Sequence, residues 1–200
     1  DIKMGYDAAK RASSKESTQG NVGCGLGATV GKILGPGNAM KSGLGSASLK
    51  TGELVVSAII SVNSYGDVFD YNSGRQLAGV YDYEKGILLN TYTLMKAQKS
   101  VAGFPIKNTA IGVVATNAVL SKAEANKVAQ MAQNGLARSV NPVHTMYDGD
   151  TIFAMATNEV KGDINLIGTM AAEAVSRAVT NAVLSAESCC GLASCCDIAK

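Results

Sequence analysis

The sequence predicts a layered α/β fold, in which strands form sheets and amphipathic helices cover them. Three apolar runs have the length of strands, and they cover residues 54–63, 110–118 and 151–157. Two other segments, which begin near Ser121 and Asn165, repeat apolar residues at helical spacing. Strands and helices mixed along one chain are typical of layered α/β proteins. No internal repeat is present, and 200 residues suit one domain over 1–200.

The first half of the chain alternates loops with one clear strand. Residues 3–12 suggest the end of a short helix, and four glycines then punctuate loops around a helical turn: Gly23, Gly25, Gly27 and Gly31. The continuous run LVVSAIISVN, residues 54–63, predicts a strand that is covered on both faces. A turn is expected at 64–67, followed by a returning strand and turn over 68–81. Residues 82–107 are more polar, which predicts a loop or linker with short helical pieces.

The second half contains the better-defined elements. AIGVVATNA (110–118) and TIFAMAT (151–157) predict two further buried strands. Ser121-Lys122-Ala123-Glu124 has the form of a capping box, which predicts that a helix begins there. A second, longer helix is expected over residues 165–186. Its apolar stripe consists largely of small residues, which permit close packing on a sheet: Ile167, Met170, Ala171, Ala174, Val175, Ala178 and Ala182.

Composition excludes several classes of function. A formal net charge of +2 gives no electrostatic reason to expect a nucleic acid or a membrane surface as partner. No apolar run reaches the roughly 18 residues that span a bilayer, and the first residues lack the order of a signal peptide. The five cysteines are an odd number, and four are crowded into SCCGLASCC. We therefore expect reduced thiols and a cytoplasmic location.

The glycine-rich stretch GCGLGATVGK resembles a phosphate-binding loop only weakly. Its Gly23-x-Gly25-x-x-Ala28 spacing is a degenerate dinucleotide pattern without a convincing strand before it. No Walker lysine-hydroxyl pair follows Lys32. A tight loop that brings backbone N–H groups and Lys32 toward a site is the better interpretation.

Two further groups have a structural and a chemical interpretation. His144 is the only histidine, so a Ser-His-Asp or Cys-His arrangement would need it, but no nucleophile-elbow motif is present and a structural role is favoured. Asp148 and Asp150 flank Gly149 before a buried strand. This pattern fits turn chemistry, and it equally fits carboxylates that orient an amine or hydroxyl.

The cysteine tail could in principle bind a soft metal such as zinc. The four residues are Cys189, Cys190, Cys195 and Cys196. Their spacing matches no common zinc motif, and no histidine lies nearby in the sequence. We therefore expect no metal.

The dipeptide Asn108-Thr109 stands between a polar segment and a buried strand. A loop-to-strand junction accounts for a threonine here, since threonine is common in such positions. The alternative is that the Thr109 hydroxyl cuts the peptide bond before it. The cut would free an α-amine, whose ordinary pKa of about 7.7–8.0 suits a base for the same hydroxyl. The pattern alone leaves both interpretations open.

Five motifs follow one another along nearly the whole chain: GNVGCGLGATVGK, MKSGLGSAS, SVNSYGDVFD, NTAIGVVATNAVLS and HTMYDGDTIFAMAT. Together they resemble the self-processing aminopeptidase family, which includes L-aminopeptidase/D-esterases, β-peptidyl aminopeptidases and endo-type nylon-oligomer hydrolases. The resemblance implies an α-β-β-α sandwich similar to that of N-terminal-nucleophile hydrolases, with different connectivity. It also implies a precursor that cuts itself into an α chain, here 1–108, and a β chain, here 109–200.

The resemblance also implies roles for individual residues. Thr109 would be the nucleophile and first residue of the β chain, and Asn108 the last residue of the α chain. Asn63 matches the family's catalytic asparagine, which would donate to an oxyanion through its amide. Lys32 matches the lysine of the nylon-hydrolase branch.

Two acidic residues complete the implied site. Asp148 and Asp150 match the Asp-Gly-Asp of the nylon-hydrolase branch, and they would orient the Thr109 amine or exchange a proton with it. Tyr147 beside them receives no role. The family's N-terminal segment has no counterpart before Asp1, so we expect apolar surface that another segment covers. We expect that a homo-oligomer, or a further segment of chain, provides this cover.

The predicted function is that of a self-cleaving amide hydrolase of aminopeptidase type. It would act on the N-terminal residues of small peptides or on related amides, without a cofactor. Two enzymatic alternatives are a nylon-oligomer-type endo-amidase and an acyl transferase similar to the ornithine acetyltransferases. The non-enzymatic alternative is a metal- or thiol-bearing interaction domain built around the cysteine tail.

Overall fold

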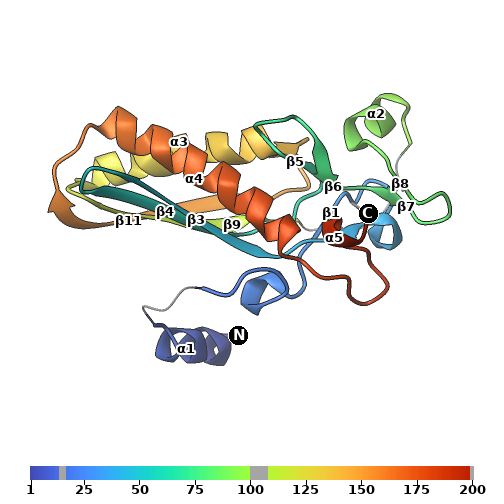
Figure 1. Cartoon of the computed structure of the whole chain (residues 1–200), viewed down its shortest axis with the longest axis horizontal. Coiled ribbons are helices and arrows are strands. Elements are labelled where there is room, and N and C mark those ends of the chain that lie inside the picture. The colour runs from blue at the N-terminus through green and yellow to red at the C-terminus, as the bar shows by residue number, and fades with distance from the viewer. Residues whose placement is uncertain (14–16, 100–107, 199–200) are drawn as a thin grey trace.

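A four-stranded sheet with the strand order β11-β9-β4-β3 forms the centre of the protein (Figure 1). The computed structural model describes residues 1–13, 17–99 and 108–198. The four strands are β3 (Leu44–Thr51), β4 (Leu54–Ser61), β9 (Ile111–Ala118) and β11 (Thr151–Val160). β4 runs antiparallel to both of its neighbours, whereas β11 runs parallel to β9. The three predicted apolar strands therefore lie side by side.

Two long helices cover one face of this sheet (Figure 1). α3 (Lys122–Ser139) begins with the predicted capping box, in which Ser121 and Glu124 bond each other's backbone N–H groups. α4 (Ile164–Leu184) begins at Asp163, whose carboxylate accepts the Leu166 N–H at 2.9 Å. Side-chain caps satisfy N–H groups that have no partner within the helix, so the sequence fixes where each helix starts.

The small-residue stripe of α4 packs directly against the sheet, as predicted. All seven residues of that stripe are buried. The approach is closest at Gly45 in β3, where a Cβ atom would lie 2.0 Å from the Ala178 carbonyl oxygen. The core lies between sheet and helices, and its largest contributors are aliphatic side chains of β4, β9, α3 and α4.

The remaining elements are short. The strands are β1 (Thr29–Val30), β2 (Met40–Lys41), β5 (Asp67–Phe69), β6 (Gln76–Ala78), β7 (Tyr81–Asp82), β8 (Ile87–Leu88) and β10 (Val140–Asn141). The helices are α1 (Ile2–Lys10), α2 (Thr91–Lys96) and α5 (Cys195–Ile198), with 3-10 turns at Gly23–Gly25 and Pro36–Asn38.

The structure adds two features to the prediction for this region. β3 was not predicted, and the strands of the segment 68–81 do not join the central sheet. Its strands β5 and β6 form a separate small sheet with β10. Of the predicted linker 82–107, residues 100–107 lie outside the described residues.

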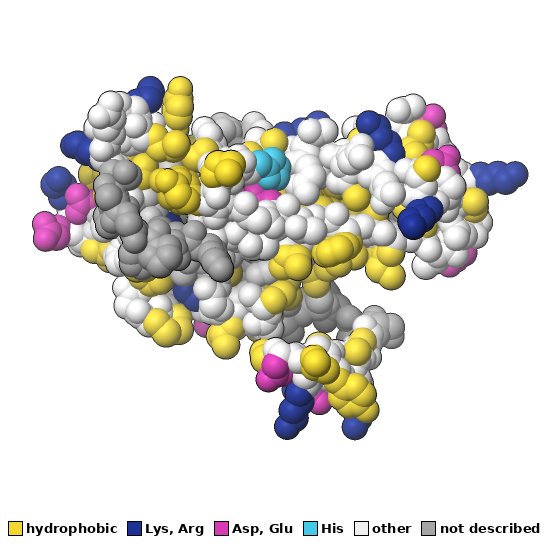
Figure 2. Space-filling view, turned by 180° about the vertical axis from the view of Figure 1, so that it is seen from behind, with side chains coloured by type: hydrophobic (Ala, Val, Ile, Leu, Met, Phe, Trp, Pro, Cys, Tyr) yellow, Lys and Arg dark blue, Asp and Glu magenta, His cyan; other side chains and the backbone are white. Residues whose placement is uncertain are grey.

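The second face of the central sheet is open within the described residues. β4 alternates buried and half-buried positions, so the prediction of a strand covered on both faces was wrong. On the open face, the exposed fractions of Ile111, Phe153 and Met155 are 46%, 57% and 57%. α1 lies on this side and contains no buried residue (Figures 1 and 2). Apolar surface of this kind was expected from the sequence.

Among the described residues, no helix combines the length and the apolar character that crossing a bilayer requires.

Candidate active site

Strands β4 and β9 bring two of the predicted site residues together at one end of the sheet. Their antiparallel register pairs Ser61 with Ile111. Two residues farther along, the Thr109 backbone N–H donates to the Asn63 carbonyl oxygen at 2.9 Å. Asn63 and Thr109 therefore meet at one end of the central sheet.

The peptide bond between Asn108 and Thr109 is held by the loop that enters β11. The Asn108 backbone N–H donates to the Tyr147 carbonyl at 3.0 Å, and the Asn108 carbonyl accepts the Gly149 N–H at 2.8 Å. These bonds extend the parallel β9–β11 pairing beyond the start of both strands. Asn108 is buried and Thr109 is exposed, so the bond between them lies at the edge of the core.

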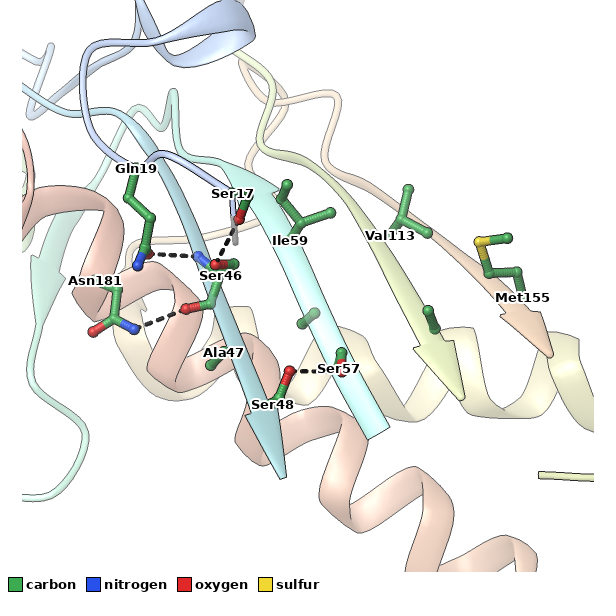
Figure 3. A pocket seen from close by; sticks show the side chains of 12 residues that line it. Ser17, Gln19, Ser46, Ala47, Ser48, Ser57, Ile59, Val113, Met155 and Asn181 are labelled. Atoms are coloured by element: carbon green, nitrogen blue, oxygen red, sulfur yellow. Dashed lines mark hydrogen bonds between the residues drawn. The ribbon is translucent and has the colours of Figure 1, made fainter. Parts of the chain in front are cut away.

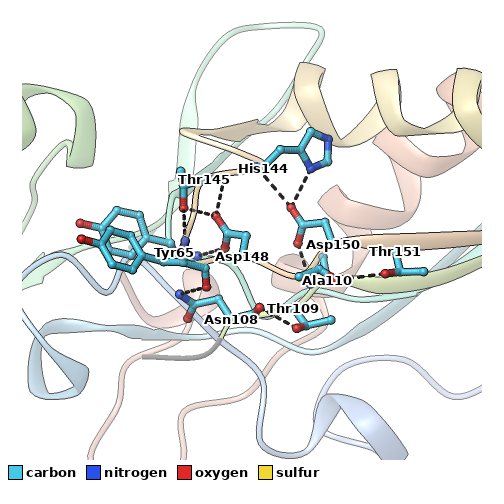
Figure 4. A network of polar contacts seen from close by, with 11 residues as sticks. Tyr65, Asn108, Thr109, Ala110, His144, Thr145, Asp148, Asp150 and Thr151 are labelled. Carbon is cyan, nitrogen blue, oxygen red and sulfur yellow. Dashed lines mark hydrogen bonds and ion pairs between the residues drawn. The ribbon is translucent and has the colours of Figure 1, made fainter. Parts of the chain in front are cut away.

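The Thr109 hydroxyl faces the peptide bond that precedes it (Figure 4). Its Oγ1 donates to the Asn108 carbonyl oxygen at 2.6 Å, the same oxygen that accepts the Gly149 N–H. Two donors therefore polarise the Asn108 carbonyl group. A side chain at position 149 would crowd the hydroxyl, because a Cβ atom there would lie 2.9 Å from Oγ1.

The buried amine of Lys32 connects the side chain of Asn108 to that of Asn63, the residue that binds the Thr109 N–H group. Its Nζ donates to Asn63 Oδ1 at 2.5 Å and to Asn108 Oδ1 at 2.9 Å. Burial lowers the pKa of Lys32 to about 7, although the Asp148 carboxylate acts in the opposite direction. Near neutral pH the amine is therefore divided between its charged and uncharged forms.

Asp150 lies next to the start of β9. Its Oδ1 accepts the Ala110 N–H at 2.8 Å, and its Oδ2 lies 3.0 Å from His144 Nδ1. The Asp150 side chain is 2% exposed, whereas that of His144 is 40% exposed. The histidine thus contacts the carboxylate from the solvent side, which agrees with the structural role favoured for it.

Asp148 fixes the turn that precedes β11. Its Oδ2 accepts the Thr145 hydroxyl at 2.6 Å and the Thr145 N–H at 3.1 Å. Its Oδ1 accepts the Tyr65 N–H at 3.1 Å, which ties the turn to the segment after Asn63 (Figure 4). The carboxylate therefore has the turn chemistry that the sequence allowed.

The site thus brings together the predicted residues with two qualifications. In the uncut chain Thr109 N is a peptide nitrogen, and it binds Asn63 rather than either carboxylate. Within the described residues, the Asn63 amide nitrogen donates no hydrogen bond, whereas its Oδ1 accepts from Lys32 and from the Thr29 N–H at 3.3 Å. The role of Gly149 was not predicted, because its contribution is a backbone N–H group. The Asp-Gly-Asp turn was the only available signal.

Apart from the site around Thr109, a hollow of about 690 Å³ lies on the open face of the central sheet (Figure 3). Ser17 and Gln19 lie beside its edge and bond Ser46 of β3, at 3.2 and 2.8 Å. Among the residues that the structure describes, its lining contains serines, the amides Gln19 and Asn181 and apolar side chains, and no ionisable group. We therefore place the candidate chemistry at Thr109 rather than in this hollow.

The sequence matches peptidase family S58 over residues 2–195. An uncharacterised aminopeptidase of Mycobacterium leprae (strain TN) is 38% identical over 216 residues, covering 96% of this chain and 56% of the relative. A 6-aminohexanoate-oligomer endohydrolase of Agromyces sp. (strain KY5R) is 28% identical over 198 residues, covering 93% and 55%. The chain therefore spans about half the length of the curated relatives that it matches.

The fold is similar to that of a solved L-aminopeptidase D-Ala-esterase/amidase from Ochrobactrum anthropi. The TM-score is 0.61 at 18% identity, and the match covers 90% of this chain and 48% of the other. That structure is described as a variant of the Ntn-hydrolase fold. At this identity the likeness concerns the fold alone, and it confirms the predicted fold class.

Proposed function

Because this chain belongs to peptidase family S58, we propose that it acts as a self-cleaving amide hydrolase of aminopeptidase type. Thr109 is its nucleophile, and cleavage between Asn108 and Thr109 frees the threonine α-amine. One observation carries the proposal: the Thr109 hydroxyl and the Gly149 N–H both donate to the Asn108 carbonyl oxygen.

Self-cleavage proceeds in two steps. Thr109 Oγ1 attacks the Asn108 carbonyl carbon, and the Gly149 N–H stabilises the negative charge that develops on the oxygen. The C–N bond then breaks, which leaves an ester between Asn108 and the Thr109 hydroxyl and a free amine on Thr109. Water hydrolyses this ester, which yields the Asn108 carboxylate and restores the hydroxyl.

We assign both proton transfers to Lys32: its uncharged amine takes the proton of the Thr109 hydroxyl, and the resulting ammonium gives a proton to the Thr109 nitrogen when the C–N bond breaks. Its pKa of about 7 provides a substantial uncharged fraction near neutral pH. An uncharged amine has two N–H bonds, and the side-chain oxygens of Asn63 and Asn108 accept two hydrogen bonds from Nζ. The lone pair of the amine is then the part that accepts a proton.

After the cut, the free α-amine of Thr109 becomes the base for its own hydroxyl. Asn63 stabilises the oxyanion formed on the substrate through its amide nitrogen, because its Oδ1 already accepts from Lys32. Asp150 orients the backbone next to the nucleophile through the Ala110 N–H. Asp148 holds the turn in place.

The substrates are proposed to be small peptides, from which the enzyme removes N-terminal residues, or related amides. A second candidate is an endo-amidase that cuts oligomers internally. It is favoured by the combination of Lys32 with Asp148-Gly149-Asp150, since the sequence resembles the nylon-hydrolase branch at these positions. One matched relative is named a 6-aminohexanoate-oligomer endohydrolase.

A substrate panel tests this proposal with the complete, purified protein. The panel contains aminoacyl p-nitroanilides, 6-aminohexanoate oligomers, and an N-acetyl donor with ornithine. Release of p-nitroaniline supports the aminopeptidase assignment, whereas internal cleavage of oligomers supports the endo-amidase. Acyl transfer to ornithine without hydrolysis would overturn both. The Thr109→Ala variant is the control and should be inactive in every arm.

We further propose that the active protein is a homo-oligomer in which a second copy covers the open sheet face. Support comes from the exposed apolar side chains of Ile111, Phe153 and Met155 on neighbouring strands. Contiguous apolar surface of this kind is typical of interfaces.

A further inference from the structure

The cysteine tail SCCGLASCC is the motif that the proposed hydrolase does not use. Its four thiols do not form a single cluster. Within the part of the chain that the structure describes, no three His, Cys, Asp or Glu side chains are grouped so that they could hold a metal ion. The tail instead contains two pairs of adjacent cysteines, and the two pairs have different backbone conformations.

The first pair, Cys189 and Cys190, lies in a tight turn. Cys189 and Leu192 exchange both backbone hydrogen bonds, at 3.1 and 3.0 Å. The central residues Cys190 and Gly191 have φ angles of 57° and 79°. Left-handed backbone at both positions is typical of a type I′ turn. This turn brings the two Sγ atoms to 3.2 Å from each other, with Cys190 exposed and Cys189 half-buried.

The second pair, Cys195 and Cys196, begins the short helix α5. Adjacent side chains on a helix do not face each other. Cys195 is 4% exposed and belongs to the hydrophobic core. Cys196 points elsewhere and donates to the Leu184 carbonyl at 2.9 Å. The chain therefore contains the same dipeptide twice, once with its thiols in contact and once with them apart.

A buried cation lies near the first pair. Lys41 is 3% exposed, and its Nζ donates to the carbonyl oxygens of Ala28 and Ser42 at 2.8 and 3.0 Å. Burial lowers the pKa of Lys41, while negative charge on Cys189 and Cys190 raises it. The hydrogen bond with Cys190 raises the pKa of Cys189, and Lys41 acts against that shift. The thiolate is the nucleophilic form of cysteine.

We propose that Cys189 and Cys190 form a dithiol site that exchanges with small disulfides and closes into a bridge. The exposed Cys190 thiolate attacks one sulfur of the external disulfide, forms a mixed disulfide and releases the first thiol. Cys189 Sγ then attacks Cys190 Sγ, forms the bridge and releases the second thiol. The external disulfide takes up the two electrons, and its two thiolates take up the protons that the cysteines lose.

The bridge should open again readily. Consecutive Cα atoms are about 3.8 Å apart, which is less than the roughly 4.4–6.8 Å that disulfides usually span. A bridge outside the usual geometry is more easily reduced. The ligand class of this site is therefore a small thiol and its disulfide.

The test treats the reduced, complete protein with excess oxidised glutathione and maps the tail by tandem mass spectrometry. In the wild type, the tail should lose the mass of two hydrogens through a Cys189–Cys190 bridge, and reduced glutathione should reverse this. Cys189→Ser and Cys190→Ser should each instead keep glutathione on the remaining cysteine of that pair. Cys24 and Cys196 are also exposed, so glutathione is expected at Cys24 in every sample and at Cys196 in every sample that retains this cysteine, in addition to the changes at Cys189 and Cys190.

The second cysteine pair supplies the matched control. A Cys195→Ser, Cys196→Ser double variant should form the Cys189–Cys190 bridge as the wild type does. Stable glutathione on Cys190 in the wild type, or a bridge that requires Cys195 or Cys196, would overturn the proposal. Amide hydrolysis is not the readout, so this result is independent of the proposed activity.

Discussion

The Nζ atom of Lys32 lies 2.9 Å from Oδ1 of Asn108, the residue whose carbonyl carbon the Thr109 hydroxyl would attack. The amine is buried, and its pKa is lowered to about 7. A modest change in pH therefore decides whether the group beside this peptide bond is charged.

Self-cleavage of the uncut protein is expected to slow as the pH falls below 7. In the proposed mechanism the uncharged form of Lys32 acts as base, so each pH unit below its pKa should reduce the rate about tenfold, with a plateau above it. Lys32→Met should remove this dependence together with most of the rate. Time courses of fragment formation on denaturing gels measure it. A rate that rises on acidification would contradict the assignment of Lys32 as base.

Gly149→Ala is expected to slow self-cleavage by about ten- to a thousandfold. The added Cβ atom would lie 2.9 Å from Thr109 Oγ1, so the hydroxyl must turn away from the Asn108 carbonyl. Folding stability should change little, because rotation of the hydroxyl relieves the contact. Gly27→Ala is the control, since a Cβ there has no neighbour within 4 Å. Equal rates in both variants would argue against a role for this geometry.

The sequence predicted the elements that carry strong local signals. β4, β9 and β11 are apolar runs, and α3 and α4 have side-chain caps and regular apolar spacing. β3 was missed because its sequence, LGSASLKT, contains glycine and small polar residues in place of an apolar run. Its strand conformation depends on pairing with β4 along all eight residues, which is a tertiary contact.

The site was predictable only as far as its side chains. Lys32, Asn63, Asn108 and Thr109 come together as the resemblance implied, from segments that are distant in the sequence. The contribution of Gly149 was not predictable, because a backbone N–H group leaves no mark on residue type. The hydrogen bonds of Asp148 within its turn depend on how Thr145 folds back, which the spacing alone did not specify.

Asp67 should make the protein less stable as the pH rises. It is fully buried and accepts hydrogen bonds from Thr91 and Val80, yet burial raises its pKa from 3.8 to about 6. Because the folded state holds this proton more tightly, its contribution to stability is complete below about pH 4 and is lost as the pH passes 6. The expected loss is about 3 kcal/mol.

Urea denaturation of the wild type and Asp67→Asn at several pH values isolates this contribution. The free energy of unfolding should fall between about pH 4 and pH 7 more steeply in the wild type than in the variant. The readout is the dependence of the unfolding free energy on pH, rather than its absolute value, since the substitution also changes the hydrogen bonds to Thr91. Parallel slopes would show that Asp67 does not titrate as described.

The open sheet face should control assembly. Phe153→Asp places a charge where the apolar side chain is 57% exposed in a single copy. A single copy leaves this charge in water, whereas a second copy packed on the face would bury it without a partner, which costs free energy. We expect light scattering to give a smaller particle for this variant than for the wild type. Ile87→Asp is the control, because Ile87 is 47% exposed on β8, away from that face. A wild type that is already a single copy would contradict the proposed oligomer.

The central claim is that Thr109 cuts the chain, and N-terminal sequencing of the purified, complete protein tests it most directly. Two fragments are expected from the wild type, the smaller of which begins Thr-Ala-Ile-Gly. Thr109→Ser should be cut slowly, because it keeps a hydroxyl, and Thr109→Ala should remain a single inactive chain. Fragments that begin at position 109 in the alanine variant, or an uncut wild type with full amidase activity, would contradict the account.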